Sequence, residues 1–389
     1  MSLILATWFF LCFVFLGVPS VYYLYMKKAA SRPWNLKIDE DYAPLVTVLI
    51  PAHNEEKSIR LKLENLWKVK YPKEKIRVIL VNDGSTDKTL EEVNDFLNGH
   101  PGLSIKILNK AERDGKSKAL NFALKHATGD VIVVSDADCF WSPDILVKAL
   151  PYLSDPSVGA VTGLEELLNP RQSWVTQTET AYNSSVHKIR TGESKIHSTI
   201  FFQGGFGAYK CMFLDEFDCD ADDSGTALNI VQRKARTLLI PEATYFTTFP
   251  GTWKGKITVK MRRAGQLIKI WFKCLKLSLK GKLVLPKKIC LPEAFLYVFN
   301  PIVFFLLVGT TSILLSKHPI LFLGFSVVLS PILLIERTRT FFIEVVQDNF
   351  VLLGALFAFV LNKEFSIWKT VEGSRTYLTK NMLEREKLV

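Results

Sequence analysis

Paired cysteines are absent from this chain of 389 residues. Its six cysteines show none of the short paired spacings that mark zinc sites, so we expect no structural zinc. These residues are Cys12, Cys139, Cys211, Cys219, Cys274 and Cys290. We interpret them as reduced thiols of a cytoplasmic domain. The sequence also has no internal repeat and no low-complexity segment.

Negative charge is missing from residues 254–292, which contain twelve Lys and Arg residues but no Asp or Glu. This segment accounts for the net charge of +11, so the rest of the chain is close to neutral. Nucleic acid is a conceivable partner for such a block. However, Lys269, Lys273, Lys276 and Lys280 recur at helical spacing with apolar residues between them. This pattern predicts an amphipathic helix against anionic membrane lipids rather than a nucleic-acid interface.

No Lys or Arg precedes the first apolar run, Leu3–Met26, and no small-residue cleavage site closes it. These absences argue against a secretory signal peptide. The uncharged run is long enough to cross a bilayer, so we expect a retained anchor within residues 1–28. Lys27, Lys28 and Arg32 follow it, which predicts an N-terminus outside and a cytoplasmic middle region.

Residues 294–361 contain further apolar segments. Ala294–Leu315 and Pro319–Ile335 predict two spans joined as a hairpin. Phe341–Leu361 has basic flanks on both sides, which favours an interfacial or re-entrant helix over a span. Its polar interruptions lie at helical spacing and are Glu344, Gln347 and Asp348. The tail, residues 362–389, is then expected to be cytoplasmic.

Carboxylates follow two short apolar runs that are typical of buried parallel strands. Asp83 comes after Arg77–Val81, and Asp136 and Asp138 come after Val131–Val134. In open α/β sheets, ligands bind at the carboxyl ends of the strands, so these side chains should gather at one edge. Asp83 fits helix capping equally well. Asp136 and Asp138 repel each other, which a bound divalent cation would relieve.

Four motifs occur in a fixed order in the first half of the chain. They are Pro51-Ala52-His53-Asn54-Glu55, Asn82-Asp83-Gly84-Ser85-Thr86-Asp87, Arg113-Asp114-Gly115-Lys116-Ser117-Lys118-Ala119-Leu120-Asn121 and Asp136-Ala137-Asp138. Over roughly Pro44–Ala264 the chain resembles family 2 glycosyltransferases, and its membrane segments make it similar to cellulose synthase-like and hyaluronan synthase-like members. The resemblance implies an α/β fold of the GT-A type. A mostly parallel central sheet is expected in a cytoplasmic catalytic domain at 44–250, followed by basic interfacial helices at 251–293.

The resemblance also implies roles for individual residues. Ala52, Asn54 and Glu55 would line the base and ribose pocket of a UDP-sugar, and Asp83 would hold its base or ribose. Lys116 and Asn121 would lie close to this donor. Asp136 would contact the ribose or sugar and share the metal site with Asp138, which binds the Mg or Mn ion that bridges the diphosphate.

In the family, an acidic pair after a Gly-rich segment supplies the catalytic base. Phe202–Gly207 is that segment here, with Gly204 and Gly205 on the acceptor side, and Asp222-Asp223 is the pair. Asp223 stands at the base position. A carboxylate there can take the proton of an acceptor hydroxyl, and one in-line displacement inverts the anomeric centre.

One motif departs from the family pattern. Members that make long polysaccharides carry Gln, two spacers, Arg and Trp on an interfacial helix, whereas this chain reads Lys260-Met261-Arg262-Arg263-Ala264. Arg263 keeps the cation for the diphosphate, and Lys260 and Arg262 are further donor-binding candidates. Ala264 removes the aromatic platform, which favours single transfer over processive synthesis.

The sequence thus leads to a hypothesis with two alternatives. It predicts an integral protein of the cell membrane whose cytoplasmic domain moves a sugar from a nucleotide donor to a glycan or lipid-linked acceptor. A polyprenyl-phosphate sugar synthase shares the donor half of the site. A non-catalytic scaffold that binds nucleotide sugars would have no use for a base at Asp223.

Overall fold

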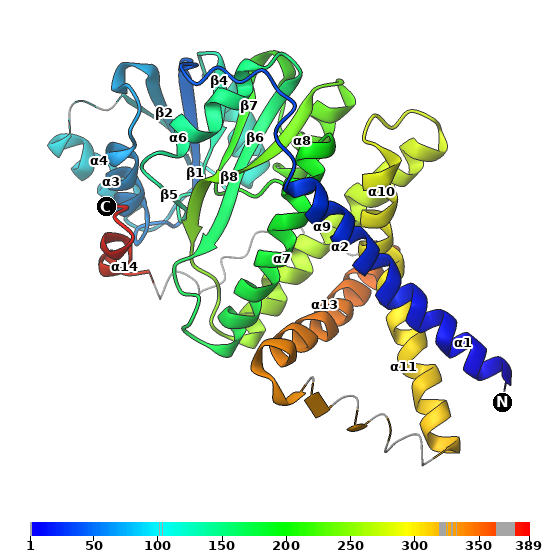
Figure 1. The fold of residues 1–389 in the computed structure, drawn as a ribbon. Helices are drawn as coiled ribbons and strands as arrows, with labels where there is room; N and C mark the ends of the chain where they lie inside the picture. Colours follow the sequence, from blue (N-terminus) through cyan, green and yellow to red (C-terminus); the bar gives the residue numbers. More distant parts are fainter. Residues whose placement is uncertain are drawn as a thin grey trace.

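The computed structural model describes residues 2–100, 102, 104–318, 324, 326–327, 330–331, 333–362 and 378–389. Within these residues, eight strands form one sheet in the order β3-β2-β1-β4-β7-β6-β8-β5 (Figure 1). The strands are β1 (Val46–Ala52), β2 (Ile76–Asp83), β3 (Ile105–Lys110), β4 (Val131–Val134), β5 (Phe140–Trp141), β6 (Val158–Leu167), β7 (Gly207–Lys210) and β8 (Arg236–Thr247). All the strand segments predicted from apolar runs fall within them.

The sheet is mostly parallel, as the sequence predicts. β1 pairs in parallel with β2 and β4, so that Val48 lies between Val78 and Val133. β7 runs antiparallel between β4 and β6, and β5 runs antiparallel to β8 at the edge. The carboxyl ends of β1, β2, β4, β6 and β8 therefore lie along one edge of the sheet.

Helices cover both faces of the sheet because its central strands are apolar on both sides. One face carries α3 (Ile59–Lys68), α4 (Thr89–Gly99) and α6 (Ile145–Ala149), and the other carries α5 (Lys116–Leu124) and α8 (Ser224–Gln232). Alternation along β1 shows why: Val48 packs in the core with Leu63, whereas Leu49 packs in the core with Leu120.

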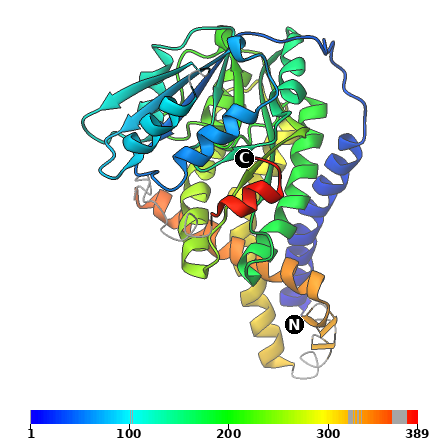
Figure 2. The same ribbon diagram turned by 90° about the vertical axis from the view of Figure 1, so that its left-hand side faces the viewer.

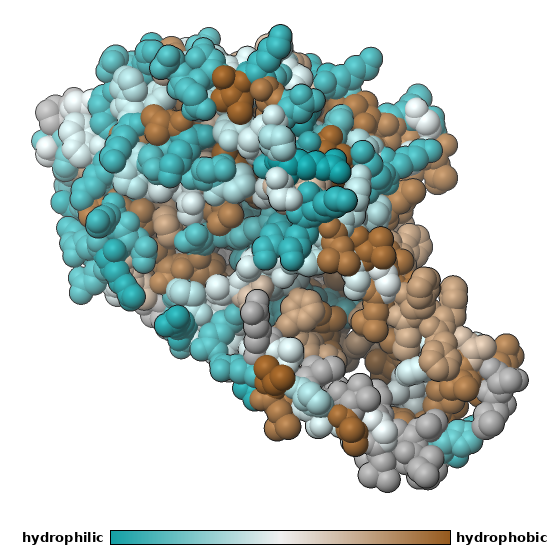
Figure 3. All heavy atoms as spheres, viewed as in Figure 1, coloured by the Kyte–Doolittle hydropathy of each residue, from teal (hydrophilic) through white to brown (hydrophobic). Residues whose placement is uncertain are grey.

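Long helices form the rest of the described chain. They are α1 (Ser2–Cys12), α2 (Val18–Ala30), α7 (Trp174–Ile196), α9 (Trp253–Leu279), α10 (Lys287–Ala294), α11 (Asn300–Lys317) and α13 (Glu336–Val360), followed by the short α14 (Lys380–Arg385). Among the described residues, Leu3–Ala30, Lys287–Lys317 and Thr338–Val360 are long and apolar enough to cross a membrane. α1 and α11 project from the sheet domain, and their surface is apolar (Figures 1 and 3).

The helix α2 packs closely on the sheet domain. α2 runs alongside α7 in both ribbon views (Figures 1 and 2). A Cβ at Gly192 of α7 would collide with the main-chain carbonyl of Met26, so glycine permits this approach. Tyr22 donates a 2.6 Å hydrogen bond to Glu193. The helix α2, part of the candidate span Leu3–Ala30, is thus fixed to the sheet domain.

α9 departs from the expectation of an apolar face against lipid. Ile268, Trp271 and Cys274 are fully buried within the protein. The basic side is also engaged, since Lys269 pairs with Asp220 at 2.9 Å. An amphipathic helix has the same periodicity whether its apolar face meets lipid or neighbouring helices, and here it meets helices.

The C-terminal segments agree only in part with the predicted membrane hairpin. α11 covers most of the predicted span Ala294–Leu315. Most of residues 319–335, which include the other predicted span of the hairpin, lie outside the described residues. In α13, Glu344 is 1% exposed and buried against protein. Residues 363–377 are also outside the description, and α14 packs through Leu383 on the sheet domain.

Candidate active site

A pocket opens at the carboxyl ends of β1, β2 and β4, and we call it the strand-end pocket. It is lined by Pro51, Ala52, His53, Glu55, Asp83, Arg113, Gly115, Lys116, Asp136, Ala137 and Asp138. Residues from all four sequence motifs therefore meet in one place. Connections from different strands converge here because parallel strands end at the same edge of the sheet.

Asp83 lies at the end of β2 and is 3% exposed. Its carboxylate accepts hydrogen bonds from the Gly115 main-chain NH at 2.8 Å and from Lys110 Nζ at 3.0 Å. The adjacent Gly84 has φ of +66°, and a Cβ there would strike the main chain of Arg113. Asp83 therefore holds the 110–115 segment that forms one wall of the strand-end pocket.

Asn54 and Glu55 shape the turn after β1. Asn54 has φ of +55°, and its side-chain oxygen accepts a 2.9 Å hydrogen bond from the Thr86 NH. Glu55 is 4% exposed and accepts a 2.7 Å hydrogen bond from Ser58. Glu55 also lines the strand-end pocket. Both residues thus brace the turn where the sequence places part of a nucleotide site.

Lys116 joins carboxylates that are far apart in the sequence. Its Nζ lies 2.8 Å from Asp136 Oδ1 and 2.9 Å from Asp222 Oδ2. Burial opposes its charge, but Asp136, Asp222 and Asp223 outweigh burial and raise the pKa of Lys116 well above its usual value. This permanent cation connects the end of β4 with the loop before α8.

Asp223 begins α8 as its N-cap and accepts a 2.6 Å hydrogen bond from the Ser224 NH. Burial and the neighbouring Asp222 raise the pKa of Asp223 to about 6, against the opposing effect of Lys116. A carboxylate with such a pKa is ionised at neutral pH and basic enough to accept a proton.

Two carboxylates near the pocket can hold a divalent cation. Asp136, Asp138 and Cys139 place their ligand atoms within 4.8 Å of one another. Burial raises the pKa of the Cys139 thiol well above its usual value, and hard divalent cations prefer oxygen ligands to sulfur. The two carboxylates are hard oxygen ligands that suit Mg or Mn.

The Gly-rich segment lies directly over this acidic group. Gly204 accepts a 2.9 Å hydrogen bond from the Asp136 NH, and Gly205 accepts one from Ser135 at 3.1 Å. A Cβ at Gly204 would lie only 2.3 Å from both Asp136 Oδ2 and Lys116 Nζ. The absence of a side chain at this position is what lets the Lys116 bridge form.

Gly204→Ala should therefore lower kcat/KM by as much as about 100-fold, the scale of a 1 Å misplacement in an active site. Sugar transfer by the purified variant measures this. Gly99→Ala is the matched control, because a Cβ at Gly99 meets no atom within 4 Å. Equal activity of the two variants would show that the bridge is dispensable.

Asn121 is not part of the strand-end pocket. Its side-chain amide donates to the Phe217 carbonyl at 2.9 Å and accepts from the Phe217 NH at 2.7 Å. Asn121 therefore orders the loop that leads to Asp222 and Asp223, and it is not among the residues that line the strand-end pocket. Its expected proximity to the donor stays a prediction.

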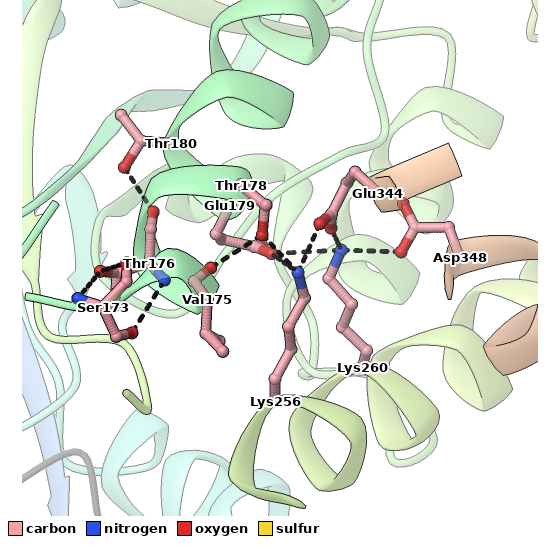
Figure 4. Close-up of polar contacts among 10 residues, drawn as sticks. All are labelled: Ser173, Val175, Thr176, Thr178, Glu179, Thr180, Lys256, Lys260, Glu344 and Asp348. Atoms are coloured by element: carbon pink, nitrogen blue, oxygen red, sulfur yellow. Dashed lines mark hydrogen bonds and ion pairs between the residues drawn. The ribbon is translucent and has the colours of Figure 1, made fainter. Parts of the chain in front are cut away.

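The basic motif of α9 divides between two sides of that helix. Lys260 pairs with Glu179 at 3.1 Å, with Asp348 at 2.7 Å and with Glu344 (Figure 4), and none of these partners lines the strand-end pocket. Burial opposes its charge, but Asp348, Glu179 and Glu344 outweigh burial and raise its pKa. Lys260 is thus engaged in internal ion pairs, and the donor contact expected from its position in the motif stays a prediction.

Arg263 faces Glu165, with Nη2 3.9 Å from Oε1. Arg262 lies one turn before Gln266, whose amide donates a 3.1 Å hydrogen bond to the Asp220 carbonyl. Arg262 is therefore on the side of α9 that contacts the loop of Asp222 and Asp223.

Electrostatics agree with this placement of Arg262. Burial and the like charge of Arg263 lower the pKa of Arg262, and Asp136, Asp223 and Asp222 oppose the shift. The guanidinium is thus close enough to these carboxylates to feel their charge. Asp223 also acts on the charge of Arg263, whose strongest acidic influence is Glu165, whereas the strongest on Arg262 is Asp136.

Two buried residues were missed by the sequence reasoning. Lys62 is fully buried and donates a 2.7 Å hydrogen bond to the carbonyl of Cys139, next to Asp138. Burial lowers its pKa to about 7. Glu165, near the end of β6, is 6% exposed, and burial raises its pKa. A carboxylate at the end of a strand is the signal that could have revealed Glu165.

The sheet, the helices on its two faces and the strand-end pocket at its edge define a domain of the GT-A type. Residues 47–217 match the family described as Glycosyl transferase family 2. The family match therefore falls on the part of the chain that carries the strand-end pocket.

Curated relatives cover part of the chain. Over 185 residues it is 32% identical to the probable glycosyltransferase YdaM of Bacillus subtilis, covering 44% of this chain and 43% of that protein. Over 257 residues it is 26% identical to the poly-beta-1,6-N-acetyl-D-glucosamine synthase of Staphylococcus epidermidis, covering 62% and 60%. The chain spans about half the length of these relatives.

A solved structure matches nearly the whole chain. The mannosyltransferase PcManGT from Pyrobaculum calidifontis, in complex with GDP-Man and Mn²⁺, superposes with a TM-score of 0.80 at 29% identity. The match covers 93% of this chain and 100% of that one. The similarity therefore includes helices outside the family 2 domain.

Proposed function

We propose that this protein is a membrane-anchored, inverting glycosyltransferase that moves a sugar from a nucleoside diphosphate donor to an acceptor hydroxyl. The observation that supports it most is the Lys116 bridge, 2.8 Å from Asp136 and 2.9 Å from Asp222. The bridge joins the strand-end pocket, which the donor motifs line, to the late acidic pair. A purely structural origin of these motifs does not require such a connection.

In this proposal Asp223 is the general base. It takes the proton of the acceptor hydroxyl while the hydroxyl oxygen bonds to the anomeric carbon and the bond to the diphosphate breaks. Attack opposite the leaving group inverts the anomeric centre. Lys116 and Arg262 would offset the negative charge that develops on the diphosphate. Glu55, Asp83 and the turn around them would hold the nucleoside.

Asp136 and Asp138 would hold the divalent cation. When bound, Mg or Mn acts as a Lewis acid for the leaving diphosphate oxygens. The proximity of their carboxylates and the Mn²⁺ of the PcManGT complex support this assignment.

The donor base is open to two candidates. The motif resemblance favours a UDP-sugar, whereas the structure of PcManGT is a complex with GDP-Man. Ribose and diphosphate are common to both donors, so the choice depends on the contacts that the pocket makes to the base.

The acceptor is proposed to be lipid-linked or a short glycan. Ala264 is 5% exposed and packs with Val351 and Ala355 of α13, so no aromatic surface for a growing polymer stands at this position. Beta-monoglucosyldiacylglycerol synthase of Nostoc, 31% identical over 138 residues, covering 36% of this chain and 30% of that protein, is a relative whose named product is a glycolipid. The apolar anchor beside α7 supports an acceptor that approaches from the membrane, with the catalytic domain in the cytoplasm.

A panel of UDP- and GDP-sugars tests the proposal. Purified protein with Mn²⁺ or Mg²⁺ should release nucleoside diphosphate from one donor, faster when membrane lipid extract is added as acceptor. Release of UDP or GDP that stops with EDTA supports the transferase. Tight nucleotide binding without turnover of any donor favours the scaffold instead, and transfer to polyprenyl phosphate alone favours the polyprenyl-phosphate sugar synthase.

A further inference from the structure

Five charged side chains meet where α7, α9 and α13 pack together (Figure 4). We call them the helix-junction network: Glu179 from α7, Lys256 and Lys260 from α9, and Glu344 and Asp348 from α13. Glu344 pairs with both lysines, and Lys256 also donates a 2.9 Å hydrogen bond to Thr178. Lys256 and Glu344 are each 1% exposed.

Stability alone is a poor explanation for this network. Removing charges from water costs several kcal/mol per ion, and buried ion pairs often add little net stability. Apolar contacts already join α9 and α13 further along, where Ala264 and Ile268 pack with Val351 and Ala355. The best-attested use of buried charges is to fix one register among several alternatives.

The network fixes the rotation of α9 about its own helix axis. Lys256, Lys260 and Arg263 are spaced at i, i+4 and i+7, which places them on one side of a helix. That side meets Glu179, Glu344 and Glu165.

A second side of α9 meets the loop that carries the acidic pair. Arg262, Gln266 and Lys269 follow the same i, i+4 and i+7 spacing, and the latter two contact Asp220 at 3.1 Å and 2.9 Å. Successive residues of a helix are about 100° apart, so a change in rotation would move Arg262 off this side. Holding Lys256 and Lys260 in place therefore determines where Arg262 points.

We propose that the helix-junction network locks the rotation of α9 and thereby holds Arg262 toward the strand-end pocket. Glu179 of α7 and the two residues of α13, Glu344 and Asp348, are then positioning residues for the Arg262 guanidinium, which meets the donor diphosphate. This inference rests on the proposed function, because it gives Arg262 a diphosphate to meet.

The test is a double-mutant cycle between Arg262 and the network. The wild type, Arg262→Met, Glu344→Gln and the double variant are assayed for kcat/KM with the donor. Glu344→Gln alone should lower kcat/KM about tenfold or more, which lies within the roughly 100-fold loss that a 1 Å misplacement in an active site produces. In the Arg262→Met background, Glu344→Gln should not lower kcat/KM any further, because the arginine side chain that Glu344 positions is already gone.

Nucleotide binding gives a readout that loss of stability would not move. Titration of UDP and GDP with Mn²⁺ should show weaker binding to Glu344→Gln, while uridine and guanosine bind as to the wild type. Asp348→Asn serves as a second variant if Glu344→Gln folds poorly, because Asp348 is the more accessible partner, with 18% of its side chain exposed. Glu336→Gln, an exposed residue of the same helix, is the control.

Additive losses in the cycle, or equal weakening of nucleoside and diphosphate binding, would overturn the inference and leave the transferase proposal intact. Wild-type protein that turns over no donor would instead overturn the proposed function, and the ratio of diphosphate to nucleoside affinity would still report on the position of Arg262.

Discussion

Asp223→Asn is expected to abolish sugar transfer while leaving metal-dependent nucleotide binding unchanged. A positioned general base contributes about 10²–10⁴-fold to the rate, and an amide cannot accept the proton. The fold should survive, because Asn is as good an N-cap as Asp and can still accept the hydrogen bond from the Ser224 NH. The loss should therefore appear in kcat rather than in the affinity for UDP or GDP.

Single-turnover transfer and nucleotide titration together measure this separation. Asp215→Asn is a matched control, because Asp215 is an exposed carboxylate of the same segment that pairs with Arg233. Normal turnover by Asp223→Asn would falsify the assignment of the base. Loss of nucleotide affinity in the same variant would instead place Asp223 among the donor contacts.

The pH dependence of transfer provides an independent check on Asp223. Burial and Asp222 raise its pKa to about 6, and the carboxylate must be unprotonated to act as a base. kcat/KM should therefore be constant near neutral pH and fall tenfold per unit below about pH 6. A profile that stays flat to pH 5 would exclude a base with this pKa.

The sheet and half of the site could be predicted because the signals are local. Short branched apolar runs mark β2 and β4, and carboxylates directly after them must lie at the edge where parallel strands end. Asp83 and Asp136 are therefore placed correctly in space by two short stretches of sequence. Their contacts are less predictable, since the main chain of Gly115 that binds Asp83 belongs to a different connection.

The helical part was harder to predict, because periodicity describes a helix but not its neighbours. The pattern of α9 correctly indicates two faces, yet Ile268 and Trp271 pack on protein and not on lipid. Lys260 has its partner Glu344 84 positions away. The signal was present in the sequence, since an apolar helix with acidic residues one turn apart requires cations, and Lys256 and Lys260 have matching spacing.

Asp138→Asn should remove the metal-dependent part of nucleotide binding. Even residues that only support metal ligands change affinity or activity by about 10–100-fold, so loss of a ligand should weaken UDP or GDP binding in Mn²⁺ by about 100-fold or more. Binding measured in EDTA should be the same in the variant and the wild type, because no cation then bridges protein and diphosphate.

Asp138→Asn should therefore lose nucleotide affinity, whereas Asp223→Asn should lose turnover and keep its affinity. This contrast is the strongest test of the site. Asp144→Asn controls for the loss of a nearby carboxylate, because Asp144 pairs with Lys148 at 2.6 Å and does not line the strand-end pocket. If Asp138→Asn keeps its full response to Mn²⁺, the cation is held elsewhere, and Asp136 acts through its ion pair with Lys116. If Asp138→Asn loses nucleotide affinity while Asp223→Asn loses only turnover, cation binding and proton transfer belong to separate carboxylates.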